Sequence, residues 1–133
     1  MQTHLYKNDL DDGVNFNGNV AIDTEAMGLD PARDRLCLIQ IYDGETDCHM
    51  VQFENSNVNS PNLVKLLSNE NIQKIFHYAR FDMAALKHAL QIDIKNVYCT
   101  KIASKIARTY TNNHGLKDLC KELLGIEISK KQQ

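Results

Sequence analysis

The chain has 133 residues, of which 43% are hydrophobic and 24% charged, and its net charge is −2. A chain of this length can bury roughly two thirds of its unfolded surface, so we expect one domain with one hydrophobic core. The N-terminal residues lack the apolar stretch of a signal peptide, and no run approaches the roughly 20 apolar residues of a membrane span. Composition therefore argues against a membrane protein and favours a soluble, cytoplasmic one.

The four cysteines, Cys37, Cys48, Cys99 and Cys120, contain no Cys-x-x-Cys pair. Two of them lie within apolar runs, where cysteine behaves as a small hydrophobic residue. Adjacent residues on a strand point to opposite faces, which disfavours a zinc site that uses both Cys48 and His49. Free thiols are typical of a reducing compartment and agree with a cytoplasmic location.

Three strands are predicted in the first half of the chain, over residues 19–24, 35–42 and 48–53. The second and third are joined by a tight turn at Asp43-Gly44. The period then changes to that of a helix, since Ser60 is a candidate cap, Pro61 suits the first helical position, and leucines follow at helical spacing.

The second half of the chain contains a strand over residues 72–77 and helices over 81–90, 99–111 and 115–124, the last ended by Gly125. A three-strand meander followed by helix, strand and helix predicts an α/β fold with a mixed central sheet flanked by helices. An all-parallel doubly wound sheet is excluded by the meander.

Two acidic residues at the end of the first predicted strand indicate a metal site. Asp23 and Glu25 are separated by one residue, so they project from the same face of a strand while Thr24 points the other way. Asp82 follows the apolar run of a later strand. Three clustered carboxylates repel one another unless a cation joins them, and oxygen-only ligands are those that Mg²⁺ or Mn²⁺ prefers.

The residues around these acids resemble a known enzyme family. The stretch 23–29, followed by 35–41, resembles the first motif of the DEDD 3′→5′ exonucleases, specifically the ribonuclease D branch. Residues 77–82 resemble the second motif, and residues 99–120 resemble the helical segment after it. The resemblance extends over nearly the whole chain.

This resemblance implies a ribonuclease H-like fold whose first strand is central. It also implies two divalent cations, Mg²⁺ or Mn²⁺, bound by catalytic Asp23, Glu25 and Asp82 together with a fourth carboxylate. The implied activity is that of a metal-dependent 3′→5′ exoribonuclease. Its partners would be single-stranded RNA or structured RNA 3′ ends, with DNA as an alternative substrate.

The resemblance also suggests substrate-binding residues. Met27, Gly28 and Leu29 follow the metal strand where the family packs against terminal nucleotides, and the glycine would permit close backbone approach. His77 and Phe81 could contact the terminal sugar and base. Core positions are the alternative for Met27, Leu29 and Phe81.

Charge is distributed unevenly along the chain. Residues 1–60 have a net charge of −8, whereas residues 61–133 have a net charge of +6. Lys101, Lys105 and Arg108 recur at helical spacing and would form one basic face that contacts phosphates, with Lys101 as the candidate substrate contact. Solvated helix faces are the alternative, with the nucleic acid passing Lys117, Lys121 and the tail at 130–131.

The family's third motif, Tyr-x-x-x-Asp or His-x-x-x-x-Asp, has no match in the sequence. His114 and Asp118 are one residue too close, and a helix beginning near Gly115 with Asp118 in its first turn explains them. We therefore expect residues 1–133 to form a single exonuclease domain that is incomplete at its C-terminus. The alternative functions are an inactive nucleic-acid-binding module, a DNA exonuclease, and a transposase or polynucleotidyl transferase.

Overall fold

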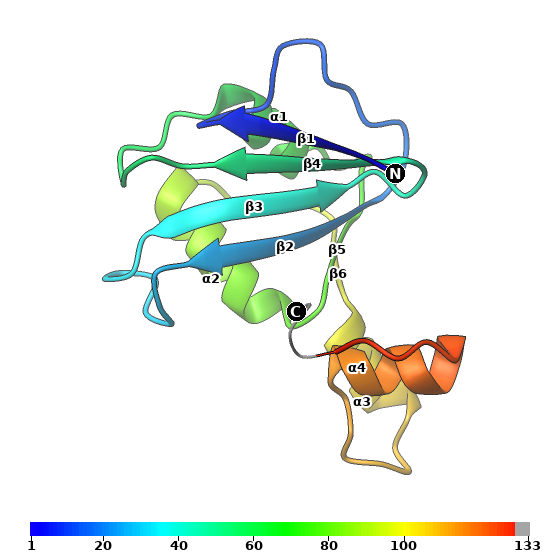
Figure 1. The fold of residues 1–133 in the computed structure, drawn as a ribbon. Coiled ribbons are helices and arrows are strands. Elements are labelled where there is room, and N and C mark those ends of the chain that lie inside the picture. The colour runs from blue at the N-terminus through cyan, green and yellow to red at the C-terminus, as the bar shows by residue number, and fades with distance from the viewer. Residues whose placement is uncertain (130–133) are drawn as a thin grey trace.

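The computed structural model describes residues 1–129, so the predicted basic tail at 130–131 lies outside the described residues. The central element is a six-stranded sheet with the order β1-β4-β3-β2-β5-β6 (Figure 1). Its strands are β1 (Gln2–Lys7), β2 (Val20–Ala26), β3 (Leu36–Tyr42), β4 (Asp47–Gln52), β5 (Lys74–Phe76) and β6 (Val97–Cys99). The helices are α1 (Pro61–Ser68), α2 (Ala79–Leu90), α3 (Thr100–Ala107), α4 (Leu116–Leu119) and a π-helical turn at Cys120–Leu124.

The sheet is mixed, as the sequence predicts. Strands β2, β3 and β4 form an antiparallel meander, while β5 pairs parallel with β2 and β6 parallel with β5. Strand β2 therefore lies inside the sheet between β3 and β5, which confirms the central position expected for the strand that carries Asp23 and Glu25.

Two strands were not predicted. Strand β1 pairs parallel with β4 at one edge of the sheet, and β6 has only three residues at the other edge. Edge strands are exposed on one side, so their sequences lack the apolar runs that mark inner strands. In β1, for example, Leu5 is 63% exposed.

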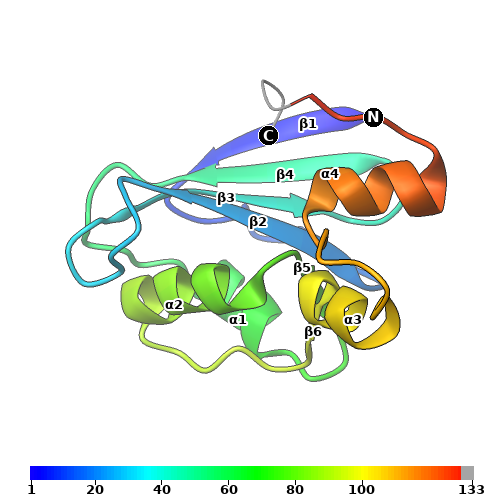
Figure 2. The same cartoon turned by 90° about the horizontal axis from the view of Figure 1, so that it is seen from below.

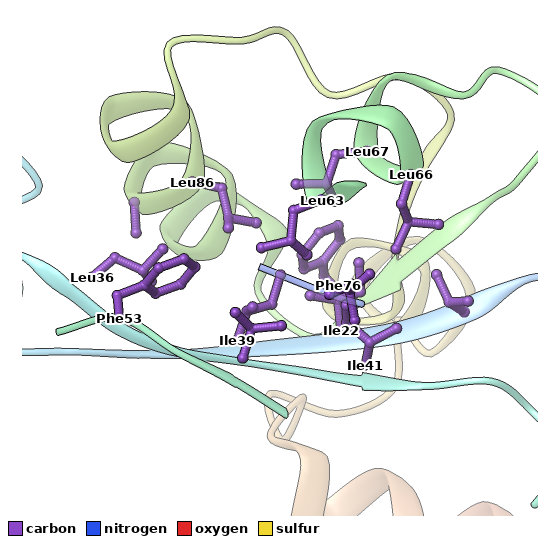
Figure 3. Packing of buried hydrophobic residues seen from close by; sticks show 14 of the residues in the cluster. Ile22, Leu36, Ile39, Ile41, Phe53, Leu63, Leu66, Leu67, Phe76 and Leu86 are labelled. Atoms are coloured by element: carbon purple, nitrogen blue, oxygen red, sulfur yellow. The ribbon is translucent and has the colours of Figure 1, made fainter. Parts of the chain in front are cut away.

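The hydrophobic core lies between the sheet and helices α1 and α2, which cover one of its faces (Figure 2). Leucines from the helices meet isoleucines from β2 and β3 and phenylalanines from β5 and the end of β4, and their side chains point toward one another (Figure 3). This packing holds α2 against β2. It therefore positions Asp82, in the first turn of α2, relative to the acids of that strand.

Helix α1 begins at Pro61, as predicted, but Ser60 does not cap it with its side chain. The Ser60 hydroxyl instead donates to the backbone oxygen of Asn8. Asp9 supplies the cap from a distance of more than 50 residues, since its carboxylate accepts hydrogen bonds from the backbone N–H groups of Asn62 and Leu63 at 3.0 Å each. The predicted local cap is thus replaced by a tertiary one.

The segment after β6 differs from its prediction in one respect that concerns the site. Helix α3 ends at Ala107 and does not reach residue 111. Arg108 is only 8% exposed, where its guanidinium forms an ion pair with Glu122 and donates to the Ser104 hydroxyl and the Asn113 backbone oxygen at 2.8 Å each. The predicted basic face of three residues is therefore wrong at Arg108, which links α3 to the π-helical turn.

The next helix agrees with the sequence. Helix α4 begins after Gly115 with Asp118 in its first turn, and the π-helical turn ends at Gly125, which adopts a φ of 67°. No helix among residues 1–129 is both long and apolar enough to span a membrane.

Candidate active site

Strand β2 presents its two acids on one face. Asp23 and Glu25 are exposed, whereas Thr24 between them is buried, as the alternation of a strand requires. The burial of Val20, Ile22 and Thr24 on the helix-covered face fixes this register, because a shift by one residue would expose them and bury both carboxylates. The predicted projection of Asp23 and Glu25 from one face is confirmed.

Asp82 approaches the same strand from the helix-covered side. It is 4% exposed and accepts a hydrogen bond from the Thr24 hydroxyl at 2.5 Å. The pKa of Asp82 is raised from its ordinary value of 3.8 to about 6, mainly by burial and also by the charges of Asp23 and Glu25, against the opposing effect of the Thr24 hydrogen bond. The three carboxylates are therefore electrostatic neighbours.

The carboxylates of Asp23, Glu25 and Asp82 are not arranged around one common point in this structure. Asp82 is directed toward Thr24, and the carboxylate oxygens of the three acids do not all come within 4.8 Å of one another. Within residues 1–129 no Lys, Arg or His side chain forms an ion pair with any of them. An oxygen-only set of acids without a cationic partner fits the ligand chemistry of Mg²⁺ or Mn²⁺.

A groove of about 570 Å³ opens on the face of the sheet that carries Asp23 and Glu25. It is also lined by Gln40 from β3, by His77 and Thr100 after β5 and β6, and by Leu116 of α4. The groove thus combines two carboxylates from the first half of the chain with polar groups from the second.

His77 is fixed within this groove. Thr100 donates its hydroxyl proton to the Phe76 backbone oxygen at 3.1 Å, so His77 Nδ1–H donates to the Thr100 oxygen at 2.9 Å. Burial lowers the pKa of His77, and the charge of Lys101 lowers it further, while the His114 backbone acts in the opposite direction. His77 is thus favoured as a neutral ring with a fixed tautomer.

Met27 and Leu29, which follow β2, lie at the surface of the molecule. Met27 is 68% and Leu29 83% exposed, which excludes the alternative that they are core residues. Gly28 has an internal role as well, because a Cβ atom there would lie 2.3 Å from an oxygen of Asp34. Phe81 is half-buried and does not belong to the core cluster, so the core alternative fails for it too.

Lys101 is near His77 but has a partner of its own. Its ammonium lies 4.2 Å from the centre of the Tyr78 ring, a cation–π contact. Tyr78 immediately precedes α2 in a left-handed conformation with a φ of 68°, which is uncommon for a residue with a side chain. Sequence reasoning missed Tyr78, Thr100 and Gln40, although Tyr78 directly follows the predicted His77.

The near match to a third motif has a structural explanation. His114 Nδ1 lies 2.7 Å from the Ser104 hydroxyl oxygen, and Asp118 lies exposed in the first turn of α4. These positions agree with the helix interpretation of the two residues.

Comparison with known proteins identifies the architecture. A family model described as 3′-5′ exonuclease matches residues 6–133. The solved structure of Brucella melitensis NrnC with bound Mg²⁺ is 49% identical to this chain, has a TM-score of 0.90, and is matched over 98% of this chain and 65% of its own length. NrnC bound to pGG is 50% identical with a TM-score of 0.90, over 98% of this chain and 64% of that one.

Escherichia coli RNase D shares the fold at 21% identity and a TM-score of 0.70, over 88% of this chain and 30% of that one. No curated protein sequence matches the chain. The chain spans just under two thirds of the length of the NrnC structures described above. Because the family model extends over almost all of the sequence and the sheet has the expected central strand, the chain belongs to the 3′-5′ exonuclease family with a ribonuclease H-like fold.

Proposed function

We propose that this chain forms a metal-dependent 3′→5′ exoribonuclease site that hydrolyses phosphodiester bonds from the 3′ end of RNA. The observation that carries the proposal is the groove in which Asp23 and Glu25 face His77, with Asp82 beside them at a raised pKa. NrnC, at 49% identity, has been solved with Mg²⁺ bound, which supports the same cofactor here.

Asp23, Glu25 and Asp82 would hold the two divalent cations, Mg²⁺ or Mn²⁺. Bound cations of this kind activate a water and stabilise the departing oxygen of a phosphodiester. The role of the protein is to supply fixed carboxylates. Thr24 contributes by donating to Asp82, which restrains that buried carboxylate in the first turn of α2.

The substrate would lie in the groove beside Asp23, Glu25 and His77, with the exposed Met27 and Leu29 following directly after β2. The two exposed apolar side chains offer surfaces for bases, with Gly28 between them, and Phe81, one residue before Asp82, adds a half-buried ring. His77, as a neutral ring whose Nδ1–H donates to Thr100, can accept a hydrogen bond from a sugar hydroxyl at Nε2 without adding charge. Lys101 would provide a positive charge for a phosphate.

The ligand of the NrnC structure also suggests a substrate length. NrnC has been solved with pGG, a two-base ligand. We infer that short 5′-phosphorylated oligonucleotides are substrates of this chain as well. The four free cysteines support activity in a reducing cytoplasm.

The test is degradation of a 5′-labelled single-stranded RNA, from two to twenty nucleotides long, with Mg²⁺, with Mn²⁺ and with EDTA. A ladder that shortens from the 3′ end only with a cation supports the proposal, and a matched DNA series measures the preference for RNA. Asp23→Asn and Glu25→Gln should abolish the ladder, whereas Glu70→Gln, an exposed acid outside the groove, should not. Binding of RNA without any shortening would favour the inactive binding module instead.

A further inference from the structure

A second group of metal-ligating side chains lies where β1 meets β4. The register pairs His4 with His49 and Tyr6 with Val51, so side chains from both strands share one face of the sheet. The rings of His4 and His49 stack with centres 5.0 Å apart, and the edge of Phe16 contacts His49 at 5.2 Å. His49 is only 8% exposed, and the proposed nuclease mechanism uses none of these residues.

Two aspartates complete the group. Ligand atoms of Asp43, Asp47 and His49 all lie within 4.8 Å of one another, and this is the one such set among residues 1–129. Ligands bound at about 2.0–2.2 Å around a tetrahedral Zn²⁺ are roughly 3.4 Å apart, so a small contraction would bring these three atoms to a metal. In contrast to the carboxylates of Asp23, Glu25 and Asp82, the ligand atoms of these three residues already lie close together in this structure.

The group is also held in place by its surroundings. One carboxylate oxygen of Asp43 accepts three backbone N–H bonds, from Glu45, Thr46 and Asp47, which leaves its other oxygen for a ligand. His49 Nδ1 lies 2.9 Å from the Tyr6 hydroxyl, and His4 Nε2 lies 3.2 Å from Asp47 Oδ2. Partners of this kind behind metal-binding imidazoles and carboxylates orient them toward the ion.

We propose that Asp43, Asp47 and His49 form a binding site for Zn²⁺ or a similar first-row transition metal. An imidazole in the ligand set favours such metals over Mg²⁺, whose preferred ligands are oxygens. Because the Tyr6 hydroxyl engages Nδ1 of His49, Nε2 is the nitrogen left for a metal. His4 orients Asp47, so the metal links the β3–β4 turn to the edge strand β1.

This site is separate from the candidate nuclease site. His49 pairs with Ile41, which in turn pairs with Ile22, so its side chain lies on the buried face of the sheet. Asp23 and Glu25 project from the opposite face. The inference therefore does not depend on the proposed nuclease function.

The experiment uses a parent variant, Asp23→Ala/Glu25→Ala, in which the oxygen-only site is removed, after treatment with EDTA. Calorimetric titration should show one equivalent of Zn²⁺ per chain and no binding of Mg²⁺, and Zn²⁺ should raise the melting temperature. Co²⁺ should give the visible absorption of a low-coordinate complex with nitrogen and oxygen ligands.

Adding Asp43→Asn or Asp47→Asn to the parent should weaken Zn²⁺ binding at least about tenfold, as loss of a ligand requires. Asp43→Asn retains the oxygen that accepts the three backbone bonds, so the turn is preserved. Glu45→Gln, in the same turn, is the matched control and should bind like the parent. The proposal is overturned if the parent binds no Zn²⁺, or if Asp47→Asn binds it equally well, which would place the metal at other residues.

Discussion

At the scale of single residues, Asp82 shows how burial and charge combine in the candidate site. Its carboxyl is 4% exposed beside two other acids, and its pKa of about 6 lies above the ordinary value of 3.8. The folded protein therefore holds this proton more tightly than the unfolded chain does. Below about pH 4 Asp82 therefore has little effect on the free energy of unfolding. As the pH rises toward about 6 it increasingly destabilises the folded state, and the destabilisation is complete above that pH.

Asp82→Asn should consequently stabilise the metal-free protein at pH 7–8. The asparagine mimics the protonated acid and can still accept the Thr24 hydrogen bond, so we expect a gain of about 1–3 kcal/mol in the free energy of unfolding. The gain should disappear below pH 4. Urea unfolding in EDTA across pH 3.5–8 measures it, with Glu70→Gln as the control, and an equal effect at every pH would contradict the assigned origin.

At the scale of elements, the loop between β2 and β3 depends on one glycine. The carboxylate of Asp34 packs against Gly28 and accepts the backbone N–H of Asp30 at 3.0 Å. A methyl group on Gly28 would overlap this carboxylate. A side chain at position 28 would therefore have to displace the Asp34 carboxylate from its hydrogen bond with Asp30.

Gly28→Ala should destabilise the protein by about 1–3 kcal/mol, the usual effect of an overpacked contact. Gly18→Ala is the matched control, because a Cβ atom there meets nothing within 4 Å and the backbone is not left-handed. Urea midpoints of the two variants give the comparison. Equal midpoints would mean that the Asp34 side chain moves aside freely.

The sequence predicts those parts of the fold and of the candidate site that local residue patterns determine, and it misses those that depend on long-range contacts. The meander, the register of Asp23 and Glu25, and the helix with Asp82 all follow from apolar periodicity and are confirmed. Strand β1 and the cap from Asp9 depend on pairing with residues more than 40 positions away, which no local pattern encodes. Likewise, the direction of Asp82 toward Thr24 depends on how α2 packs on the sheet.

On helix α3, only Lys101 and Lys105 remain as candidate contacts for the phosphates of a nucleic acid. Lys105 is exposed and Lys101 half-buried over Tyr78, whereas Arg108 is buried and paired with Glu122. Lys101→Gln together with Lys105→Gln should flatten the dependence of log affinity on log salt by about 0.7 for each lost contact with a single-stranded RNA.

Arg108→Gln should behave differently from the two lysine substitutions. It should lower the melting temperature and leave the salt dependence unchanged, because the Arg108 guanidinium holds α3 to the loop before α4 and to the π-helical turn. Fluorescence anisotropy in EDTA at several salt concentrations separates the two effects. If the lysine variant keeps the full slope, the RNA follows another surface.

At the scale of the whole molecule, the sheet order explains why a chain with an acidic first half and a basic second half makes one site. Strand β2 from the first half pairs with β5 from the second, so the groove lies where the two halves meet. Asp23 and Glu25 come from the first half of the chain, whereas Asp82, His77, Thr100 and Lys101 come from the second. Among residues 1–129, folding the halves together also brings Asp23, Glu25 and Asp82 close to one another without an ion pair to any of them, so a bound cation should stabilise the domain.

Mg²⁺ should therefore raise the melting temperature of the wild-type chain. A ligand that binds only the folded state adds about 2.7 kcal/mol at a concentration one hundred times its dissociation constant. Asp23→Asn should melt at a higher temperature than the wild type in EDTA, because it relieves repulsion with Glu25 and Asp82, yet it should lose the response to Mg²⁺. Glu70→Gln should keep that response. An Asp23→Asn protein that Mg²⁺ stabilises as strongly as the wild type would place the cation away from β2, and the proposed nuclease site would lose its cofactor.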